Sequence, residues 1–105
     1  MKKDIVALFK QSVLKILRTP KVKFILFGSR GRGDAEEFSD YDILIITSQK
    51  EPEVKKIKDK IEEIETDIFV THNAIINSHL FSEKELKRLS FESFIINALQ
   101  EGVAA

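Results

Sequence analysis

Apolar residues recur at the spacing of an amphipathic helix in three parts of the chain. These parts lie at residues 5–17, 54–64 and 90–101. Pro20 ends the first helix, because a proline disfavours helical geometry in the residue before it. The segment from Ser48 to Glu51 has the form of a capping box, and Pro52 suits the first turn of the second helix. Gly102 is a suitable stop for the third helix.

Short runs of β-branched and aromatic residues predict three strands, at residues 22–27, 41–47 and 66–71. Gly28 ends the first run, and a loop rich in glycine and charge follows over residues 28–40. Residues 73–80 are expected to form a loop or a short turn of helix. Ser82 and Glu85 then have the spacing of a capping box for one more helix, which would run to about residue 89.

The order of these elements is helix, strand, strand, helix, strand and one or two helices, which predicts an α/β (α+β) domain. Its core would be a small mixed sheet with helices packed against it. The predicted strands 41–47 and 66–71 are joined through a helix, which favours parallel pairing between them. The first two strands are joined by an irregular loop and could pair either way. A chain of 105 residues is expected to form one domain, spanning residues 1–105.

The composition excludes several classes of protein. The chain has 17 basic and 17 acidic residues, and a net charge of zero disfavours nucleic-acid binding by bulk electrostatics. It has no Cys, which excludes a disulfide scaffold and a thiol nucleophile and fits a cytoplasmic protein. Its uninterrupted apolar runs are far shorter than the roughly 20 residues that span a bilayer, so no membrane span is expected. His72 and His79 lack the spacing of zinc ligands.

The loop over residues 28–40 carries the features of an anion site. Its glycines fit neither the dinucleotide fingerprint nor the Walker motif, because the spacing is Gly-x-x-Gly-x-Gly and Asp34 follows Gly33. Gly28 at the end of a buried strand would let backbone amides approach an anion closely. Ser29 adds a hydroxyl donor, and the loop's two arginines, Arg30 and Arg32, offer charged groups that suit phosphate oxygens.

Asp40 and Asp42 stand at the start of the second predicted strand with one residue between them. Strand side chains alternate, so both carboxylates should project from one face. Two carboxylates at such a short distance repel each other unless a cation lies between them. Mg²⁺ or Mn²⁺ is the cation expected there, because both prefer oxygen ligands. An anion cradle beside such a metal site is what a nucleoside triphosphate requires. The alternative interpretation of the acidic pair is a solvated turn.

Asp67 interrupts the third predicted strand, and on a neighbouring strand it would stand beside Asp40 and Asp42. Three carboxylates could hold two metal ions, one on the triphosphate and one on an attacking hydroxyl. Asp67 would then lower the pKa of that hydroxyl, through its metal or as a base. Taken alone, Asp67 would be interpreted as a charge on an edge strand.

These residues resemble the nucleotidyltransferase superfamily that includes DNA polymerase β and kanamycin nucleotidyltransferase. The match is closest to its minimal prokaryotic members, through the segment from Gly28 to Gly33 and the segment from Ser39 to Asp42. The resemblance implies that Gly28 and Ser29 contact the phosphates of ATP, that Arg30 and Arg32 occupy the basic loop positions, and that the carboxylates bind Mg²⁺. The set of acidic residues that it implies is Asp40, Asp42 and Asp67.

The resemblance also implies a partner. Minimal members typically act with a small all-helical protein of the HEPN type, in a toxin–antitoxin pair in which AMP is added to a toxin Tyr. The expected function is therefore Mg²⁺-dependent transfer of a nucleoside monophosphate from ATP to a hydroxyl, with a homodimer as a further possibility. The alternative is an antitoxin that neutralises its partner by contact without catalysis. Nucleic-acid elongation is disfavoured by the neutral charge.

Overall fold

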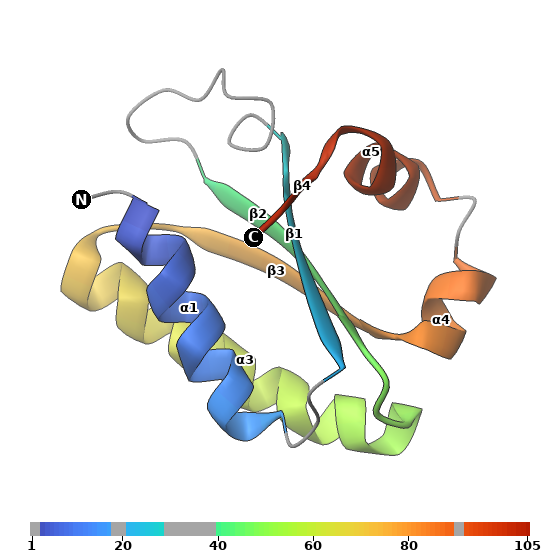
Figure 1. Cartoon of the computed structure of the whole chain (residues 1–105). Coiled ribbons are helices and arrows are strands. Elements are labelled where there is room, and N and C mark those ends of the chain that lie inside the picture. The colour runs from blue at the N-terminus through green and yellow to red at the C-terminus, as the bar shows by residue number, and fades with distance from the viewer. Residues whose placement is uncertain (1–2, 18–20, 29–39, 90–91) are drawn as a thin grey trace.

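In the computed structural model, the described residues are 3–17, 21–28, 40–89 and 92–105. The elements along the chain are α1 (Lys3–Ile16), β1 (Val22–Phe27), β2 (Tyr41–Thr47), α3 (Glu51–His72), β3 (Ile76–Ser82), α4 (Glu83–Arg88), α5 (Ser93–Glu101) and β4 (Val103–Ala104) (Figure 1). This is the expected mixed α/β architecture. Among the described residues, no helix has both the length and the apolar character needed to cross a bilayer.

The strands form one mixed sheet in the order β3-β2-β1-β4. β1 pairs antiparallel with β2, so that Phe27 lies opposite Asp42, and β1 also pairs antiparallel with the short β4. β2 and β3 are parallel, because α3 carries the chain back along the sheet between them. The sheet therefore brings the end of β1 and the starts of β2 and β3 to one edge.

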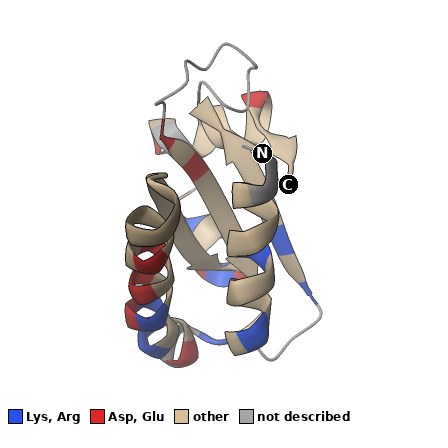
Figure 2. Ribbon diagram, turned by 90° about the vertical axis from the view of Figure 1, so that its left-hand side faces the viewer, with Lys and Arg blue, Asp and Glu red and all other residues tan. Residues whose placement is uncertain are grey.

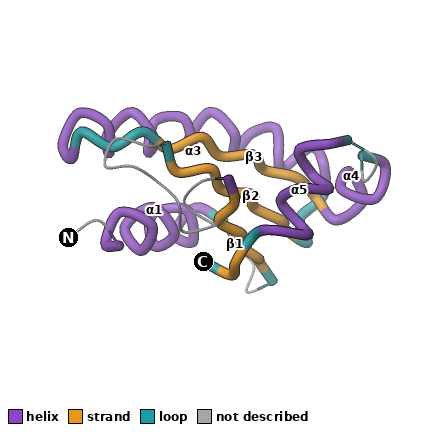
Figure 3. The backbone as a smooth tube through the Cα atoms, turned by 90° about the horizontal axis from the view of Figure 1, so that it is seen from above, coloured by secondary structure: helices purple, strands orange, loops and turns teal. Residues whose placement is uncertain are grey.

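Helices cover both faces of the sheet. α1 and α3 lie on one face and α4 and α5 on the other (Figures 1 and 3). The larger core lies beneath α1 and α3, where Tyr41, Ile43 and Ile45 of β2 point. Leu44 and Ile46 alternate with them and pack on the other face with Ala98 of α5.

The first two predicted strands, 22–27 and 41–47, have the bounds of β1 and β2. The third is wrong: residues 66–71 continue α3, which runs unbroken to His72. The reason is periodicity, since Ile61 and the buried Ile68 lie seven residues apart and extend the apolar stripe of the helix. The third strand is β3, in the segment that was expected to be a loop.

Some of the predicted helix boundaries are confirmed and others are wrong. Ser82 and Glu85 do form the expected capping box at the start of α4, and Gly102 is the C-cap of α5. The capping box expected at Ser48 to Glu51 is wrong, because Lys50 is the N-cap of α3 and makes no side-chain cap hydrogen bond. The stop expected at Pro20 lies outside the described residues.

Candidate active site

The site is built where β1 ends and β2 begins. Gly28 follows the last residue of β1 with a φ of +68°, a left-handed conformation that favours glycine. A Cβ at this position would lie 2.5 Å from Oδ2 of Asp42, so the backbone at Gly28 is packed directly against that carboxylate. The end of one strand thereby fixes where the acid of the next strand can lie.

Asp40 is held from the opposite side. Nδ2 of Asn77, in β3, donates a hydrogen bond of 2.8 Å to Oδ2 of Asp40. Asn77 is also paired in register with Asp42 across the parallel β2–β3 ladder. The hydrogen bond and the register together place Asp40, Asp42 and Asn77 at one edge of the sheet.

β3 also brings a second polar side chain, that of His79, near Asp42. His79 lies two residues beyond Asn77, on the same face of β3, and its ring centroid is 6.1 Å from that of Phe27. Burial lowers the pKa of His79 below its ordinary value of 6.5, and the negative charge of Asp42 opposes that shift. Burial therefore favours the uncharged form of the imidazole near Asp42.

Asp67 does not join this group. It lies on α3 with its side chain exposed, and α3 packs on the sheet face opposite to the one that carries Leu44 and Ile46. Asp42 shares the face of Leu44, so the sheet separates it from Asp67. The predicted three-carboxylate cluster is accordingly absent: within the described residues no group of three His, Cys, Asp or Glu side chains is placed to hold a metal ion.

Asp67 belongs instead to the charged surface of α3, where acidic residues follow basic ones along the helix (Figure 2). It borders a surface hollow together with Asp59, Glu62, Glu63 and Thr66. Its backbone carbonyl accepts a hydrogen bond of 2.7 Å from the Thr71 hydroxyl, as in a regular helix turn. The error in placing Asp67 follows directly from assigning residues 66–71 to a strand.

Asn77 and His79 were not predicted as site residues, because residues 73–80 were expected to form a loop. The sequence signal for this strand is weak, because only Ile76 and Leu80 are apolar on the buried face and Ser78 between them is polar. The remaining predicted residues of the anion cradle, Ser29, Arg30 and Arg32, lie outside the described residues.

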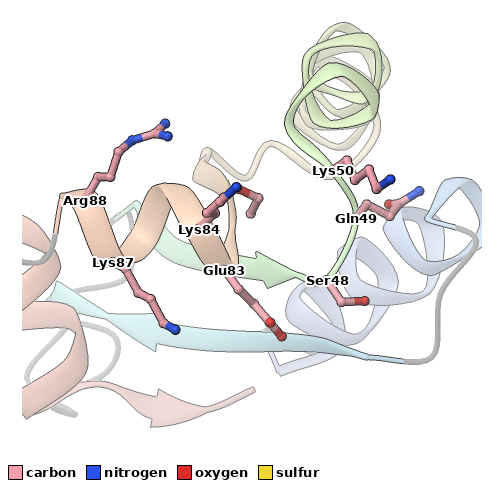
Figure 4. A pocket seen from close by; sticks show the side chains of 8 residues that line it. Ser48, Gln49, Lys50, Glu83, Lys84, Lys87 and Arg88 are labelled. Carbon is pink, nitrogen blue, oxygen red and sulfur yellow. The ribbon is translucent and has the colours of Figure 1, made fainter.

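A second hollow lies at the other end of β2 and carries the opposite charge. Lys50, Lys84, Lys87 and Arg88 line it with Glu83 (Figure 4), and its volume is about 620 Å³. These residues come from the segment after β2 and from α4. Asp42 lies at the start of β2 and Lys50 follows its end, so the strand's length separates this basic hollow from the acidic pair.

Comparison with known proteins shows the family of the chain. The model of the family described as "Nucleotidyltransferase domain" matches residues 7–104. The chain belongs to the nucleotidyltransferase family. The match spans the acidic pair, Gly28 and every strand of the sheet, so this nucleotidyltransferase carries its site within the matched region.

Two curated relatives are similar over most of this nucleotidyltransferase. Both come from Methanocaldococcus jannaschii and both carry the name "Putative protein adenylyltransferase". One is 34% identical over 80 residues, which cover 76% of this chain and 79% of the relative. The other is 35% identical over 80 residues, which cover 76% of this chain and 73% of the relative.

Proposed function

We propose that this nucleotidyltransferase moves AMP from ATP to a hydroxyl group of a partner protein and releases pyrophosphate. The observation that carries the proposal is the placement of Asp40 and Asp42 at the sheet edge beside Gly28. The family match supplies the reaction class. The names of the two relatives support AMP as the group transferred and a protein as the acceptor.

The residues at this edge fit a magnesium ion. Carboxylate and amide oxygens are the ligands that Mg²⁺ prefers, and Asp40, Asp42 and Asn77 offer both kinds. A side chain on Gly28 would enter the space of the Asp42 carboxylate, so glycine keeps that oxygen in place for a ligand. Asp40 and Asp42 would hold the metal. When bound, Mg²⁺ supplies charge stabilisation for the phosphate oxygens of ATP as the bond at the α-phosphorus breaks.

The chain's own groups then have defined tasks. The acceptor hydroxyl loses its proton to water and its oxygen bonds to the α-phosphorus, while the bond from the α-phosphorus to the bridging oxygen breaks and pyrophosphate leaves with that bond's electron pair. Asp40 and Asp42 would hold the cation that keeps the triphosphate in place for this displacement, and positioning of this kind supplies a large part of the rate in phosphoryl transfer. The backbone of Gly28 lies beside Asp42, and with no side chain in the way its own amide could approach the phosphates.

The proposed acceptor is a Tyr of an all-helical HEPN-type partner, as the resemblance to minimal nucleotidyltransferases implies. A phenolic hydroxyl is chemically suited because it ionises more readily than an aliphatic one. The proposed setting is a cytoplasmic toxin–antitoxin pair, in which this chain is the antitoxin. A homodimer of the transferase is compatible with the same chemistry.

Transfer is tested with ATP labelled at its α-phosphate, Mg²⁺ and the product of the adjacent gene. We expect label on the partner with the wild type and none with Asp42→Asn. Asp67→Asn is the matched control, because it removes the same charge from an exposed position on the other side of the sheet, and it should label the partner normally. Unlabelled partner in every reaction, including the wild type, would refute transfer to this acceptor.

A second candidate function is favoured by one observation: among the described residues, no third acidic side chain lies beside Asp40 and Asp42. In that case the chain neutralises its partner by contact and binds nucleotide without using it. A tight complex that forms equally with wild type and Asp42→Asn, and suppresses the partner without any label, would favour this function over transfer.

A further inference from the structure

The described strands next to β2 are β1 and β3, and a third acid on either of them could share a cation with Asp40 and Asp42. Neither strand holds a carboxylate: the sequence of β1 is Val22-Lys23-Phe24-Ile25-Leu26-Phe27 and that of β3 is Ile76-Asn77-Ser78-His79-Leu80-Phe81-Ser82. On β3, the residue in register with Asp42 is Asn77. The described part of the site therefore carries two negative charges, with a neutral amide where a third carboxylate would stand.

We propose that Asn77 is the positioning residue of this site and that, with two carboxylates and one amide, the site holds one divalent cation in the nucleotide complex, not two. The inference rests on the proposed function in taking Asp40 and Asp42 as the metal ligands. The direct observation is the 2.8 Å hydrogen bond from Nδ2 of Asn77 to Oδ2 of Asp40.

The amide has a definite physical effect. A carboxylate at position 77 would stand within hydrogen-bonding distance of Asp40 and repel it in the absence of a cation. An amide in that place donates to Asp40, so the carboxylate is oriented before any metal arrives. With an amide in place of a carboxylate at position 77, the site also has one negative charge fewer. A second divalent cation then lacks a third carboxylate ligand and the negative charge that would balance it.

The main test is the number of Mn²⁺ ions bound per chain with a non-hydrolysable ATP analogue, counted by electron paramagnetic resonance. We expect one ion for the wild type and two for Asn77→Asp, which rebuilds a third carboxylate. Asn97→Asp is the matched control, since it adds the same charge on the exposed surface of α5 and should bind one ion. Two ions in the wild type, or one ion in Asn77→Asp, would overturn the proposal.

The positioning role is tested with Asn77→Ala. Removing a residue that orients a metal ligand typically weakens metal affinity by about 10- to 100-fold, and we expect a loss in this range for Mn²⁺. Asn77 is exposed, so this variant is expected to fold, and its thermal unfolding checks that it does. Unchanged Mn²⁺ affinity in folded Asn77→Ala would overturn the role assigned to this amide.

The ion count and the transfer assay test the two proposals separately. If no variant labels a partner protein but the ion counts are one and two as stated, the proposed transfer is wrong and the inference about Asn77 holds. If the wild type labels its partner and binds two ions, the transfer stands and the inference is refuted.

Discussion

Replacing Gly28 by Ala perturbs the contact on which the site depends. The position has a φ of +68°, and a side chain there costs about 1–2 kcal/mol of stability because L-residues crowd their own carbonyl in this conformation. The new Cβ would also lie 2.5 Å from Oδ2 of Asp42, whereas ordinary contact begins near 3.4 Å. The carboxylate must therefore move by about 1 Å, and a misplacement of that size costs on the order of 10²-fold in rate.

The assay is the initial rate of AMP transfer at saturating ATP, measured beside the free energy of unfolding from urea denaturation. We expect the transfer rate of Gly28→Ala to fall about 100-fold. This fall should remain after the rate is corrected for the fraction of unfolded protein. The matched control is Gly102→Ala, where a Cβ would collide with the carbonyl of Ala98 and the side chain of Ile25, and where Asp42 is not among the nearest neighbours. Overpacking there should cost about 1–3 kcal/mol of stability without lowering the rate of the folded protein.

A folded Gly28→Ala protein that transfers AMP at the wild-type rate would refute this reasoning. So would an equal loss of rate in Gly102→Ala, because the effect would then reflect stability alone.

Two other predictions follow from charged groups on the two faces of the sheet. Asp42→Asn should weaken Mn²⁺ binding at least about 10-fold, whereas Asp67→Asn should leave it unchanged in the same titration; a comparable loss in both would contradict the placement of Asp67 on α3. Burial raises the pKa of Glu65 above its ordinary value of 4.5, against the opposing hydrogen bonds from Ser78. A raised pKa means that the folded state binds the proton more tightly, so this group's contribution to stability is fully present below pH 4.5 and is lost as the pH rises through the folded pKa. Glu65→Gln, which keeps an acceptor for Ser78, should therefore flatten that fall in urea unfolding measured across pH, and an unchanged profile would refute the interpretation.

The sequence predicted the part of the fold whose pattern is unambiguous. The apolar runs that form β1 and β2 are bounded by glycine, acidic residues and polar turns, so their limits are local properties of the chain. The capping box of Ser82 and Glu85 is local as well, and it forms as expected. The placement of Asp42 beside Gly28 follows from the antiparallel register of β1 and β2, which the sequence left open.

The third strand could not be located in the same way. Residues 66–71 contain β-branched and aromatic side chains that suit a strand, but Phe69 and Val70 are exposed on the last turns of α3. Helix packing decides the outcome there, because Ile61 and Ile68 must both reach the core beneath α3. Moving the strand to residues 76–82 replaces Asp67 by Asn77 at the site, so one error in secondary structure changed the expected chemistry.

The most direct test is a crystal structure with Mn²⁺ and a non-hydrolysable ATP analogue, in which anomalous scattering locates the metal. We predict a Mn²⁺ peak between Asp40 and Asp42, at about the 2.0–2.2 Å expected for hard oxygen ligands, with the triphosphate beside Gly28. Mn²⁺ found only on the acidic surface of α3 near Asp67, with no metal or nucleotide at the start of β2, would contradict the assignment of this edge as the active site.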